Sequence, residues 1–504
     1  MKKTLSILFT AAVSVSIAQP NFVKDSLDAY INREMKRWQI PAVSVAIVKD
    51  GKIVACKGYG TTELNGKTKV DENTLFQIAS NSKAFTGTAI AMLDVRKKLS
   101  LDDKATKWLP YFSLKEKYAS EQTTVRDLLC HRIGFQTFQS DFLNWNCNLT
   151  RKQVIEGMRN VTPVNSFRYK YGYCNSAFLA AGEVIPAVTD TTWYDFIKYN
   201  FFVPLKMERS STQHKYIVAD KNAAKPYTII LDKMEALDYA NVDNIGPAAS
   251  INSCVKDLSN WVLCQLDSGK FGGKQVVPYK ALALTRSPNM ISGGRGGNPA
   301  YPNNHFSMYG LGWSIMDVGG KVMYEHTGGA DGFVTSVCVI PEAKLGVVVL
   351  TNTDVNGLFL NLREQIVQAY FDMPYKNLSE ASFKRNEVGN KEANDELRDW
   401  KNRTMQKNLV QPKADLFVGK YKNEVYGDME IKKEGNQLVL NFANHPMAKG
   451  KLEYMGNDEF MCTYTYKTWG ITKMKVKYED AQVKSVIVKV NDFVDYMDYD
   501  FKRQ

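Results

Sequence analysis

Residues 76–92 read FQIASNSKAFTGTAIAM, and the interpretation of the whole chain starts from this stretch. The apolar residues before Ser80 and the small or apolar residues after Lys83 predict a buried helix that extends to about residue 98. A buried lysine is unusual and requires a partner or a lowered pKa. Because residues three apart share one face of a helix, the Lys83 amine can take the proton of the Ser80 hydroxyl and make Ser80 a nucleophile.

The Ser-x-x-Lys pattern occurs again at residues 253–256, so the pattern alone does not identify a site. Ser253 precedes apolar residues at helical spacing, and we interpret it as a helix N-cap that satisfies free backbone N–H groups. Ser80 could be a plain N-cap in the same way. A lysine inside an apolar helix distinguishes the two serines and favours Ser80 as the nucleophile.

A second candidate motif is Tyr173-Cys174-Asn175, where a loop leads into an apolar helix. A tyrosine near a lysine can act as a base, and an asparagine amide can orient a substrate. Tyr-x-Asn also occurs elsewhere, and Tyr239 is the runner-up. Taken alone, either tyrosine could simply pack beside a turn.

The third candidate motif is His326-Thr327-Gly328-Gly329, at the end of a predicted strand. Small residues at a strand end let a substrate backbone approach closely and pair as an added strand. The backbone N–H groups of Gly329 and Ser80 could together form an oxyanion hole. The alternative for this motif alone is a histidine in a glycine-containing turn.

The three motifs are specific in combination, because they occur in one order with gaps of about 90 and about 150 residues. In this order they resemble the penicillin-recognising serine hydrolases, which include class C β-lactamases, D-alanyl-D-alanine peptidases, D-aminopeptidases and related esterases. Four further segments are similar to that family, and the resemblance covers about residues 25–370. These segments are residues 124–134, 202–207, 246–253 and 309–313.

The resemblance implies roles for the motif residues. Ser80 would be the acylated nucleophile, and Lys83 and Tyr173 would share general acid–base catalysis, with the holder of the proton left open. The substrate-binding residues would be Asn175, which binds the substrate amide, and His326, Thr327 and Gly328 on the opposite wall. The backbone N–H groups of Ser80 and Gly329 would bind the oxyanion. The mechanism implies neither a metal nor an organic cofactor.

His326 departs from the penicillin-specific members of the family, which have a lysine at this position. That lysine places a cation near the substrate carboxylate, whereas a histidine with a pKa of about 6.5 is mostly neutral at pH 7. The histidine is more similar to the peptidase and esterase members.

The rest of the chain predicts an α+β fold with an appended β domain. A helix over 22–38, a hairpin over 43–56 and three strands between 321 and 350 build an antiparallel sheet from both ends of one region. The resemblance implies helices flanking this sheet and a helical subdomain. We expect a hydrolase domain over 19–375 and a charged, partly helical linker over 376–410. Residues 411–504 alternate in short β runs and resemble a lipocalin-like all-β domain, a small barrel or sandwich.

The amino terminus predicts export. Lys2 and Lys3 precede an apolar run over 5–17, and small residues at 16 and 18 fit a signal peptidase site, so we expect residues 1–18 to be a cleaved signal peptide. The alternative is an uncleaved anchor, but the run is shorter than the roughly 20 apolar residues of a membrane span. We therefore expect a periplasmic or secreted protein without a stable membrane span.

Composition excludes other classes of protein. Hydrophobic residues are 44% and charged residues 23% of the 504 residues, which is the ordinary globular range. The formal net charge of +12 comes without a long Lys/Arg block, so we expect a solvated basic surface and no nucleic-acid partner.

The sequence therefore predicts a serine hydrolase that forms an acyl-Ser80 intermediate with an ester or a D-amino-acid-containing peptide amide. Candidate substrates are small molecules or peptides, including those of cell-wall origin. The alternatives are a non-catalytic protein that binds or senses cell-wall fragments, and a true β-lactamase. The β domain could be a substrate-gating cap, a dimer contact or a wall-binding module. A contact between one of its loops and the Ser80 pocket would favour the cap. The oligomeric state stays open.

Overall fold

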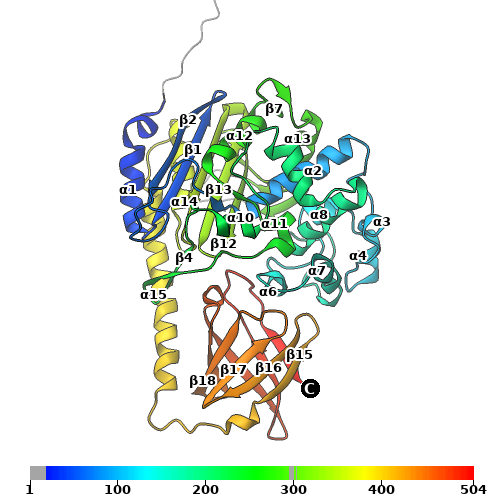
Figure 1. Ribbon diagram of the computed structural model, residues 1–504, viewed down its shortest axis with the longest axis vertical. Helices are drawn as coiled ribbons and strands as arrows, with labels where there is room; N and C mark the ends of the chain where they lie inside the picture. Colours follow the sequence, from blue (N-terminus) through cyan, green and yellow to red (C-terminus); the bar gives the residue numbers. More distant parts are fainter. Residues whose placement is uncertain (1–18, 295–299, 302–303) are drawn as a thin grey trace, which may run out of the picture.

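The computed structural model describes residues 19–294, 300–301 and 304–504. The predicted signal peptide, residues 1–18, lies outside the described residues. An α+β part stands above a β-barrel, and one long helix, α15, runs down the side of the molecule from the first part to the second (Figure 1). None of the helices in the described part of the chain combines the length and the apolar character that crossing a membrane requires.

The centre of the upper part is an eight-stranded sheet in which all neighbouring strands are antiparallel. The predicted strands from the two ends of the region become neighbours where β1 pairs with β14. In sheet order the strands are β2 (Lys52–Gly60), β1 (Ala42–Lys49), β14 (Leu345–Thr351), β13 (Phe333–Ile340), β12 (Lys321–Ala330), β11 (Ser314–Val318), β10 (Ser307–Tyr309) and β9 (Met290–Gly293).

The first hairpin of the sheet forms where the Asp-Gly pair predicts it. Asp50 and Gly51 both adopt positive φ, 51° and 74°, as the tight turns between β-strands require. Strand β1 is buried on both faces. Val45 and Ile47 belong to one hydrophobic cluster and Ala46 to the other. Because neither face of the strand meets water, its sequence is a nearly continuous apolar run without alternation of polar and apolar residues.

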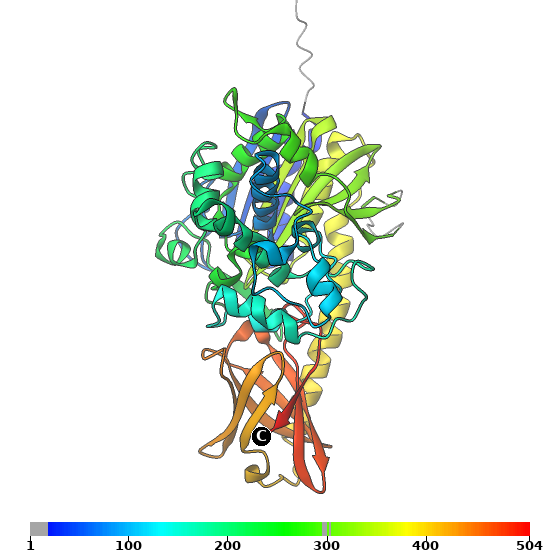
Figure 2. The ribbon, with the colours of Figure 1, turned by 90° about the vertical axis from the view of Figure 1, so that its right-hand side faces the viewer.

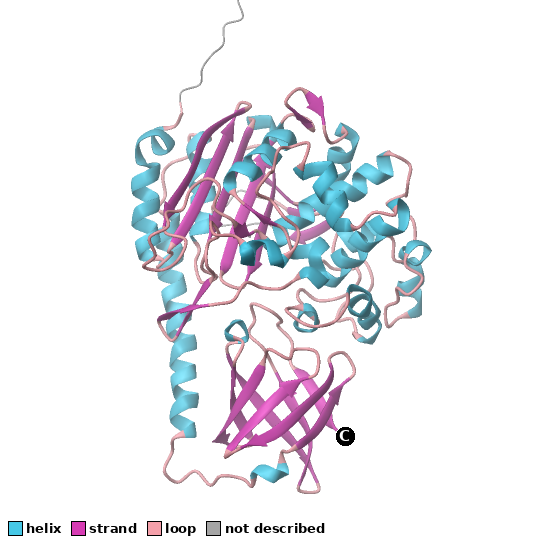
Figure 3. Cartoon of the chain, in the orientation of Figure 1, coloured by secondary structure: helices cyan, strands magenta, loops and turns pink. Residues whose placement is uncertain are grey.

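Helices cover both faces of this sheet (Figure 3). Helices α1 and α14 pack on one face, and the other face carries helices that also build the neighbouring helical subdomain. The helices before α15 are α1 (Leu27–Arg37), α2 (Ser82–Val95), α3 (Ala105–Trp108), α4 (Lys117–Gln122), α5 (Val125–Leu129), α6 (Asp141–Asn144), α7 (Arg151–Gly157), α8 (Asn175–Thr189), α9 (Trp193–Ile197), α10 (His214–Ala219), α11 (Gly246–Ala249), α12 (Val255–Leu266), α13 (Tyr279–Thr285) and α14 (Leu358–Tyr370). Short strand pairs accompany them: β3 (Phe76–Gln77) with β6 (Asn252–Ser253), β4 (Tyr227–Ile230) with β5 (Lys233–Ala236), and β7 (Lys270–Phe271) with β8 (Lys274–Gln275).

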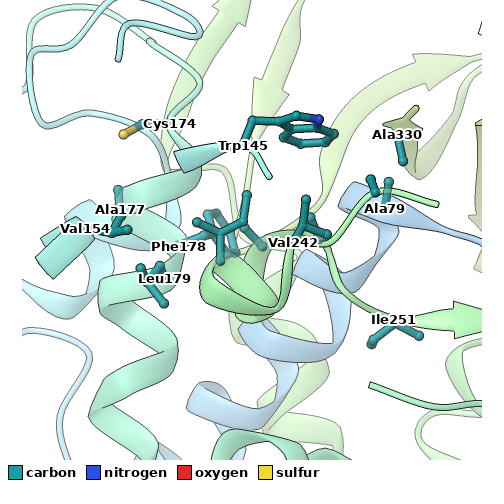
Figure 4. Close-up of a cluster of buried hydrophobic side chains, with 14 of the residues drawn as sticks. Ala79, Trp145, Val154, Cys174, Ala177, Phe178, Leu179, Val242, Ile251 and Ala330 are labelled. Atoms are coloured by element: carbon teal, nitrogen blue, oxygen red, sulfur yellow. The ribbon is translucent and has the colours of Figure 1, made fainter. Parts of the chain in front are cut away.

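The predicted buried helix after Ser80 is α2, in which every residue from 82 to 93 is buried. Its packing is close enough to require a small residue. A Cβ on Gly87 would lie 2.0 Å from the carbonyl oxygen of Leu311. Beside α2, the side chains of Val154, Phe178, Val242 and Ile251 come from four separate segments and gather in one apolar cluster (Figure 4). Buried residues of α2 belong to the same hydrophobic core.

Residues 419–503 contain the strands of a closed antiparallel barrel, which is the small all-β domain that the alternating pattern predicts. The barrel closes where β15 pairs with β22. Its strands are β15 (Gly419–Asn423), β16 (Gly427–Glu434), β17 (Gln437–Phe442), β18 (Lys449–Gly456), β19 (Glu459–Tyr464), β20 (Ile471–Glu479), β21 (Gln482–Val488) and β22 (Tyr499–Arg503).

The charged segment before the barrel forms one helix, α15 (Leu378–Thr404). The helix is fixed at both ends. Ser379 is buried, accepts a hydrogen bond from Nε1 of Trp38 (2.8 Å) and donates to Glu34 (2.7 Å), while Trp400 packs against Met455 of the barrel.

The barrel is docked against the upper part through an aromatic plug. Phe142 of α6 is buried, and its ring lies 4.4 Å from Tyr426, 4.7 Å from Trp469 and 5.1 Å from both Phe442 and His445. All four partners belong to the barrel domain, which lies directly below the sheet and helices in this view (Figure 2). This docking brings a barrel loop to the Ser80 region.

Candidate active site

A cavity of about 470 Å³ lies where the Ser80 turn, the end of β12 and the barrel meet. The sequence-predicted residues that line it are Ser80, Tyr173, Asn175, His326, Thr327, Gly328 and Gly329. Lys83 lies directly behind Ser80. The three motifs, which are far apart in the sequence, therefore converge on one pocket.

Ser80 lies just before α2, in the 3-10 turn η2 (Ala79–Asn81), at the amino-terminal end of the predicted helix. Ala79 is fully buried and adopts a φ of 47°, which a non-glycine residue rarely does. Pairing of β3 with β6 fixes the chain immediately before this turn. Ser80 thus belongs to the first turn of the helical segment, where backbone N–H groups lack acceptors within the helix.

Lys83 is fully buried, and its amine contacts three oxygen atoms. Its Nζ lies 3.2 Å from Oγ of Ser80, 2.6 Å from Oδ1 of Asn175 and 3.0 Å from the carbonyl oxygen of Ala248. Burial lowers the pKa of Lys83 to about 7, partly opposed by the nearby carboxylate of Asp141. The neutral amine is therefore accessible near pH 7. It can donate to Asn175 and Ala248 while its lone pair faces the Ser80 hydroxyl.

The phenol of Tyr173 lies close enough to the Ser80 side chain to be influenced by it, and the centroid of its ring lies 4.5 Å from Nζ of Lys83. Burial raises the pKa of Tyr173 well above its ordinary value, so the phenol keeps its proton at neutral pH. His131 supports this motif from behind. Its ring lies 4.3 Å from that of Tyr173, and its Nδ1 accepts a hydrogen bond from the backbone N–H of Cys174 (3.0 Å).

Asp141 is a site residue that sequence reasoning missed. It lines the pocket, is buried, and accepts a hydrogen bond of 2.6 Å from Nδ2 of Asn175. This contact fixes the Asn175 amide so that its oxygen faces Lys83. Burial, together with Asp495 of the barrel, raises the pKa of Asp141 to about 7. The available signal in the sequence is an acidic residue that opens a short, mostly apolar segment, residues 141–145.

His326 lies on β12 opposite Ser80 and is nearly fully buried. Its Nδ1 lies 2.5 Å from the carbonyl oxygen of Thr327 and must donate to it, so Nε2 accepts from the Tyr309 hydroxyl at 2.9 Å. Burial, reinforced by Lys83, lowers the pKa of His326 to about 3, which keeps the imidazole neutral. Among the described residues that line the pocket, none is a lysine or an arginine.

The end of β12 has a free edge. Its pairing with β11 stops at Glu325, whereas its pairing with β13 continues to Ala330. On the side away from β13, residues 326–330 therefore have backbone N–H and C=O groups that do not pair with β11. Gly328 is required for the strand to reach the Ser80 turn, since a Cβ there would lie 2.0 Å from the carbonyl oxygen of Ile78.

The barrel contributes Asp492, Phe493, Val494 and Tyr496 to the pocket lining. These residues lie in the segment between β21 and β22, which we call the barrel loop and define as residues 491–497. A barrel loop therefore contacts the Ser80 pocket. Of the three roles considered for the β domain, this contact favours a substrate-gating cap over a dimer contact or a wall-binding module.

The two competing motif residues lie elsewhere. Tyr239 stacks on Phe333 with ring centroids 6.2 Å apart and is not among the pocket-lining residues. The expectation that Ser253 caps a helix is wrong. Ser253 is in β6, its hydroxyl pairs with that of Ser210 at 2.8 Å, and the N-cap of α12 is Cys254. Within the described residues, no three His, Cys, Asp or Glu side chains are grouped so that they could hold a metal ion.

Comparisons with known proteins agree with this fold. A family model described as beta-lactamase matches residues 27–371, and one described as a domain of unknown function, DUF3471, matches residues 410–503. Protein flp of Staphylococcus aureus strain MW2 is 26% identical over 363 residues, which cover 69% of this chain and 67% of that protein. Unguisins hydrolase ungD of Aspergillus violaceofuscus is 26% identical over 355 residues, which cover 66% of this chain and 62% of that protein.

Among solved structures, the octameric penicillin-binding protein homologue from Pyrococcus abyssi superposes with a TM-score of 0.60 at 20% identity, covering 94% of this chain and 99% of that chain. The likeness supports the fold of both the upper part and the barrel. Since the first family model spans residues 27–371 of 504, more than half of the chain, the protein belongs to the beta-lactamase family of serine hydrolases.

Proposed function

We propose that the protein is a secreted or periplasmic hydrolase that is acylated at Ser80 by a neutral ester or by a peptide amide, D-amino-acid-containing peptides included. One observation carries this proposal. The Nζ of a fully buried Lys83, with its pKa lowered to about 7, lies 3.2 Å from Oγ of Ser80. A base that is neutral at working pH and in contact with a hydroxyl is what activation of a serine requires.

The acylation step follows from these contacts. Neutral Lys83 takes the Ser80 proton as Oγ attacks the substrate carbonyl carbon, and the carbonyl oxygen becomes an oxyanion. The N–H groups of Ser80 and Gly329 donate to that oxyanion. When the intermediate collapses, the bond to the leaving group breaks and the leaving group takes a proton from Tyr173, which Lys83 reprotonates. Water then repeats the sequence on the acyl-enzyme and releases the acid.

The remaining predicted residues bind and orient the substrate. Nδ2 of Asn175 has one hydrogen that is not committed to Asp141, and this hydrogen is available to a substrate carbonyl. The free edge of β12 at Thr327 and Gly328 can pair with a substrate backbone on the opposite side.

The electrostatics favour a substrate without a carboxylate near the reacting bond. His326 is held neutral, and no lysine or arginine occurs among the described lining residues to balance a negative charge. This argues against a true β-lactamase and against removal of a carboxyl-terminal residue. The name of the unguisins hydrolase, a relative, supports hydrolysis as the activity. A non-catalytic binding protein would have no need of the contact between Lys83 and Ser80.

Intact-protein mass spectrometry tests the proposal. Purified full-length mature protein is incubated with a fluorophosphonate probe, together with Ser80→Ala and Ser253→Ala. Ser253→Ala is the control, because Ser253 stands in the second Ser-x-x-Lys pattern. We expect one adduct on the wild type, one on Ser253→Ala and none on Ser80→Ala. Equal labelling of all three proteins, or of none, would contradict an activated Ser80. To test cleavage after residue 18, the chain is expressed with residues 1–18 included, and the mass of the recovered protein is measured.

A further inference from the structure

The barrel loop reaches the reacting centre of the site. Phe493 lies against Gly329, the proposed oxyanion donor, since a Cβ on Gly329 would be 3.3 Å and 3.4 Å from two atoms of the Phe493 ring. The ring of Tyr496 lies 5.4 Å from that of Phe138, which in turn lies 5.5 Å from the ring of Tyr173. The loop therefore spans from the oxyanion side of the pocket to the side of the catalytic tyrosine.

The loop is held in place from both parts of the protein. Asp495 is fully buried and accepts hydrogen bonds from the hydroxyls of Tyr426 and Tyr499 (both 2.9 Å), from the N–H of Met497 (2.9 Å) and from the N–H of Phe142 (3.3 Å). The last donor belongs to α6, next to Asp141. The Asp495 carboxylate serves several donors at once, and removing it would take this acceptor from buried polar groups, which is costly. The loop is thus a built wall of the pocket.

The wall crosses the path of an extended substrate. A chain that pairs with the free edge of β12 and continues along the strand past Gly329 meets the ring of Phe493. The lining at this end is mostly apolar or aromatic, with Phe493, Val494, Tyr496 and Phe138, and its one acidic residue, Asp492, is paired with Lys489 (2.8 Å). A compact apolar group fits such a surface, whereas a polymer chain has no exit along the strand.

We propose that the barrel loop is the specificity-determining end wall of the substrate site. The enzyme then acts on short substrates or on the ends of chains. The substrate group that lies against Phe493 and Tyr496 is compact, neutral, and apolar or aromatic. This inference rests on the proposed function, because it assigns the substrate class of the same site. It also explains why the two parts of the protein are interlocked. Displacing the barrel would remove one wall of the pocket.

The test compares small and large esters on the full-length protein. Initial rates are measured with p-nitrophenyl acetate and p-nitrophenyl decanoate, which vary the acyl side, and with acetates of increasingly large alcohols, which vary the leaving-group side. The proteins are the wild type, Tyr496→Ala, the Phe493→Ala/Tyr496→Ala double variant, and the control Tyr478→Ala. Tyr478 is an exposed barrel tyrosine outside the pocket. Fluorophosphonate labelling counts active sites in each preparation.

We expect the double variant to raise the large-to-small ratio of kcat/KM about tenfold in at least one series, the scale of a lost pocket contact. Tyr496→Ala should change the ratio in the same direction by less, and because Tyr496 is 46% exposed this variant should fold even if the double variant does not. Tyr478→Ala should leave the ratio unchanged. Unchanged ratios in both loop variants, with normal fluorophosphonate labelling, would overturn the end wall alone. A wild type that is not labelled would overturn the proposed acylation and this inference with it.

Discussion

The Nζ of Lys83 lies closer to Oδ1 of Asn175, at 2.6 Å, than to Oγ of Ser80, at 3.2 Å. Asn175 is in turn held by Asp141, whose carboxylate accepts from Nδ2. The position of the base is therefore set by a chain of three buried side chains, the last of which touches the barrel interface. Chemistry at Ser80 and docking of the barrel are connected through Asp141 and its neighbour Phe142.

The first prediction concerns the pH dependence of acylation. With the pKa of Lys83 lowered to about 7, the amine is protonated below that pH and cannot accept the Ser80 proton. We expect kcat/KM for p-nitrophenyl acetate to rise as the pH increases through about 7 and then to level off. Lys83→Arg should reduce kcat/KM by about 10²-fold or more. Lys256→Arg, in the second Ser-x-x-Lys pattern, should change neither the rate nor the profile, and an unchanged profile in Lys83→Arg would refute the assignment.

The second prediction concerns Asp141. Its pKa in the folded protein, about 7, lies above the value of about 3.9 expected in the unfolded chain. The folded state thus binds this proton more tightly, and the stabilisation is complete below about pH 4 and is lost as the pH rises through 7. Asp141→Asn carries no titrating group, so its melting temperature relative to wild type should increase from about pH 4 to pH 7.

Activity separates a positioning role of Asp141 from a purely structural one. The amide oxygen in Asp141→Asn can still accept from Asn175, whereas Asp141→Ala leaves Nδ2 of Asn175 without this partner. We expect Asp141→Ala to lower kcat at least about tenfold and Asp141→Asn to restore most of it. Asp267 is exposed, and Asp267→Asn is the control for the melting temperature and for kcat. Equal activity of the alanine and asparagine variants would argue against positioning.

The third prediction concerns the approach of β12 to the Ser80 turn. A Cβ on Gly328 would lie 2.0 Å from the carbonyl oxygen of Ile78 and 2.6 Å from Oγ1 of Thr335, so Gly328→Ala must push the strand away. We expect loss of fluorophosphonate labelling and a decrease of about 1–3 kcal/mol in the free energy of unfolding. Gly389→Ala in α15, where nothing lies within 4 Å of the new Cβ, should instead be neutral or slightly stabilising. A normally labelled Gly328→Ala protein would contradict the close approach.

The sheet and the three motifs could be predicted because each depends on local signals. The Asp50-Gly51 turn, the apolar runs of β12 to β14 and the spacing of Ser80 and Lys83 are all visible within a few residues. The capping box at Thr124, whose side chain and that of Asp127 satisfy each other's backbone N–H groups, is local in the same sense. The charged helix and the alternating strands of the barrel follow from periodicity.

What could not be predicted depends on contacts between distant segments. Asp141 meets Asn175 across 34 residues, the neighbouring Phe142 meets Asp495 of the barrel loop across 353, and no periodicity links these positions. Ser253 has every local feature of an N-cap, but pairing of β6 with β3 places it in a strand instead. Phe493 occurs in a segment of mixed polarity between two strands, and only docking of the barrel brings it against Gly329.

The last prediction concerns the plug itself. The ring of Phe142 fills a space lined by Tyr426, Phe442, His445 and Trp469, so Phe142→Ala should leave a cavity at the interface and lower the free energy of unfolding by about 3–5 kcal/mol. Because the N–H of Phe142 holds Asp495 and the preceding residue holds Asn175, loosening this helix should also disturb the barrel loop and the base. Denaturant unfolding measures the loss of stability, and fluorophosphonate labelling together with ester hydrolysis rates on the same samples measures the effect on the site. Phe306→Ala, which removes an exposed ring, controls for loss of an aromatic side chain and should alter neither. If Phe142→Ala lost stability but kept the wild-type rate and ester selectivity, the barrel would be a stabilising partner only, and the connection from the plug through Asp141 to Lys83 would be refuted.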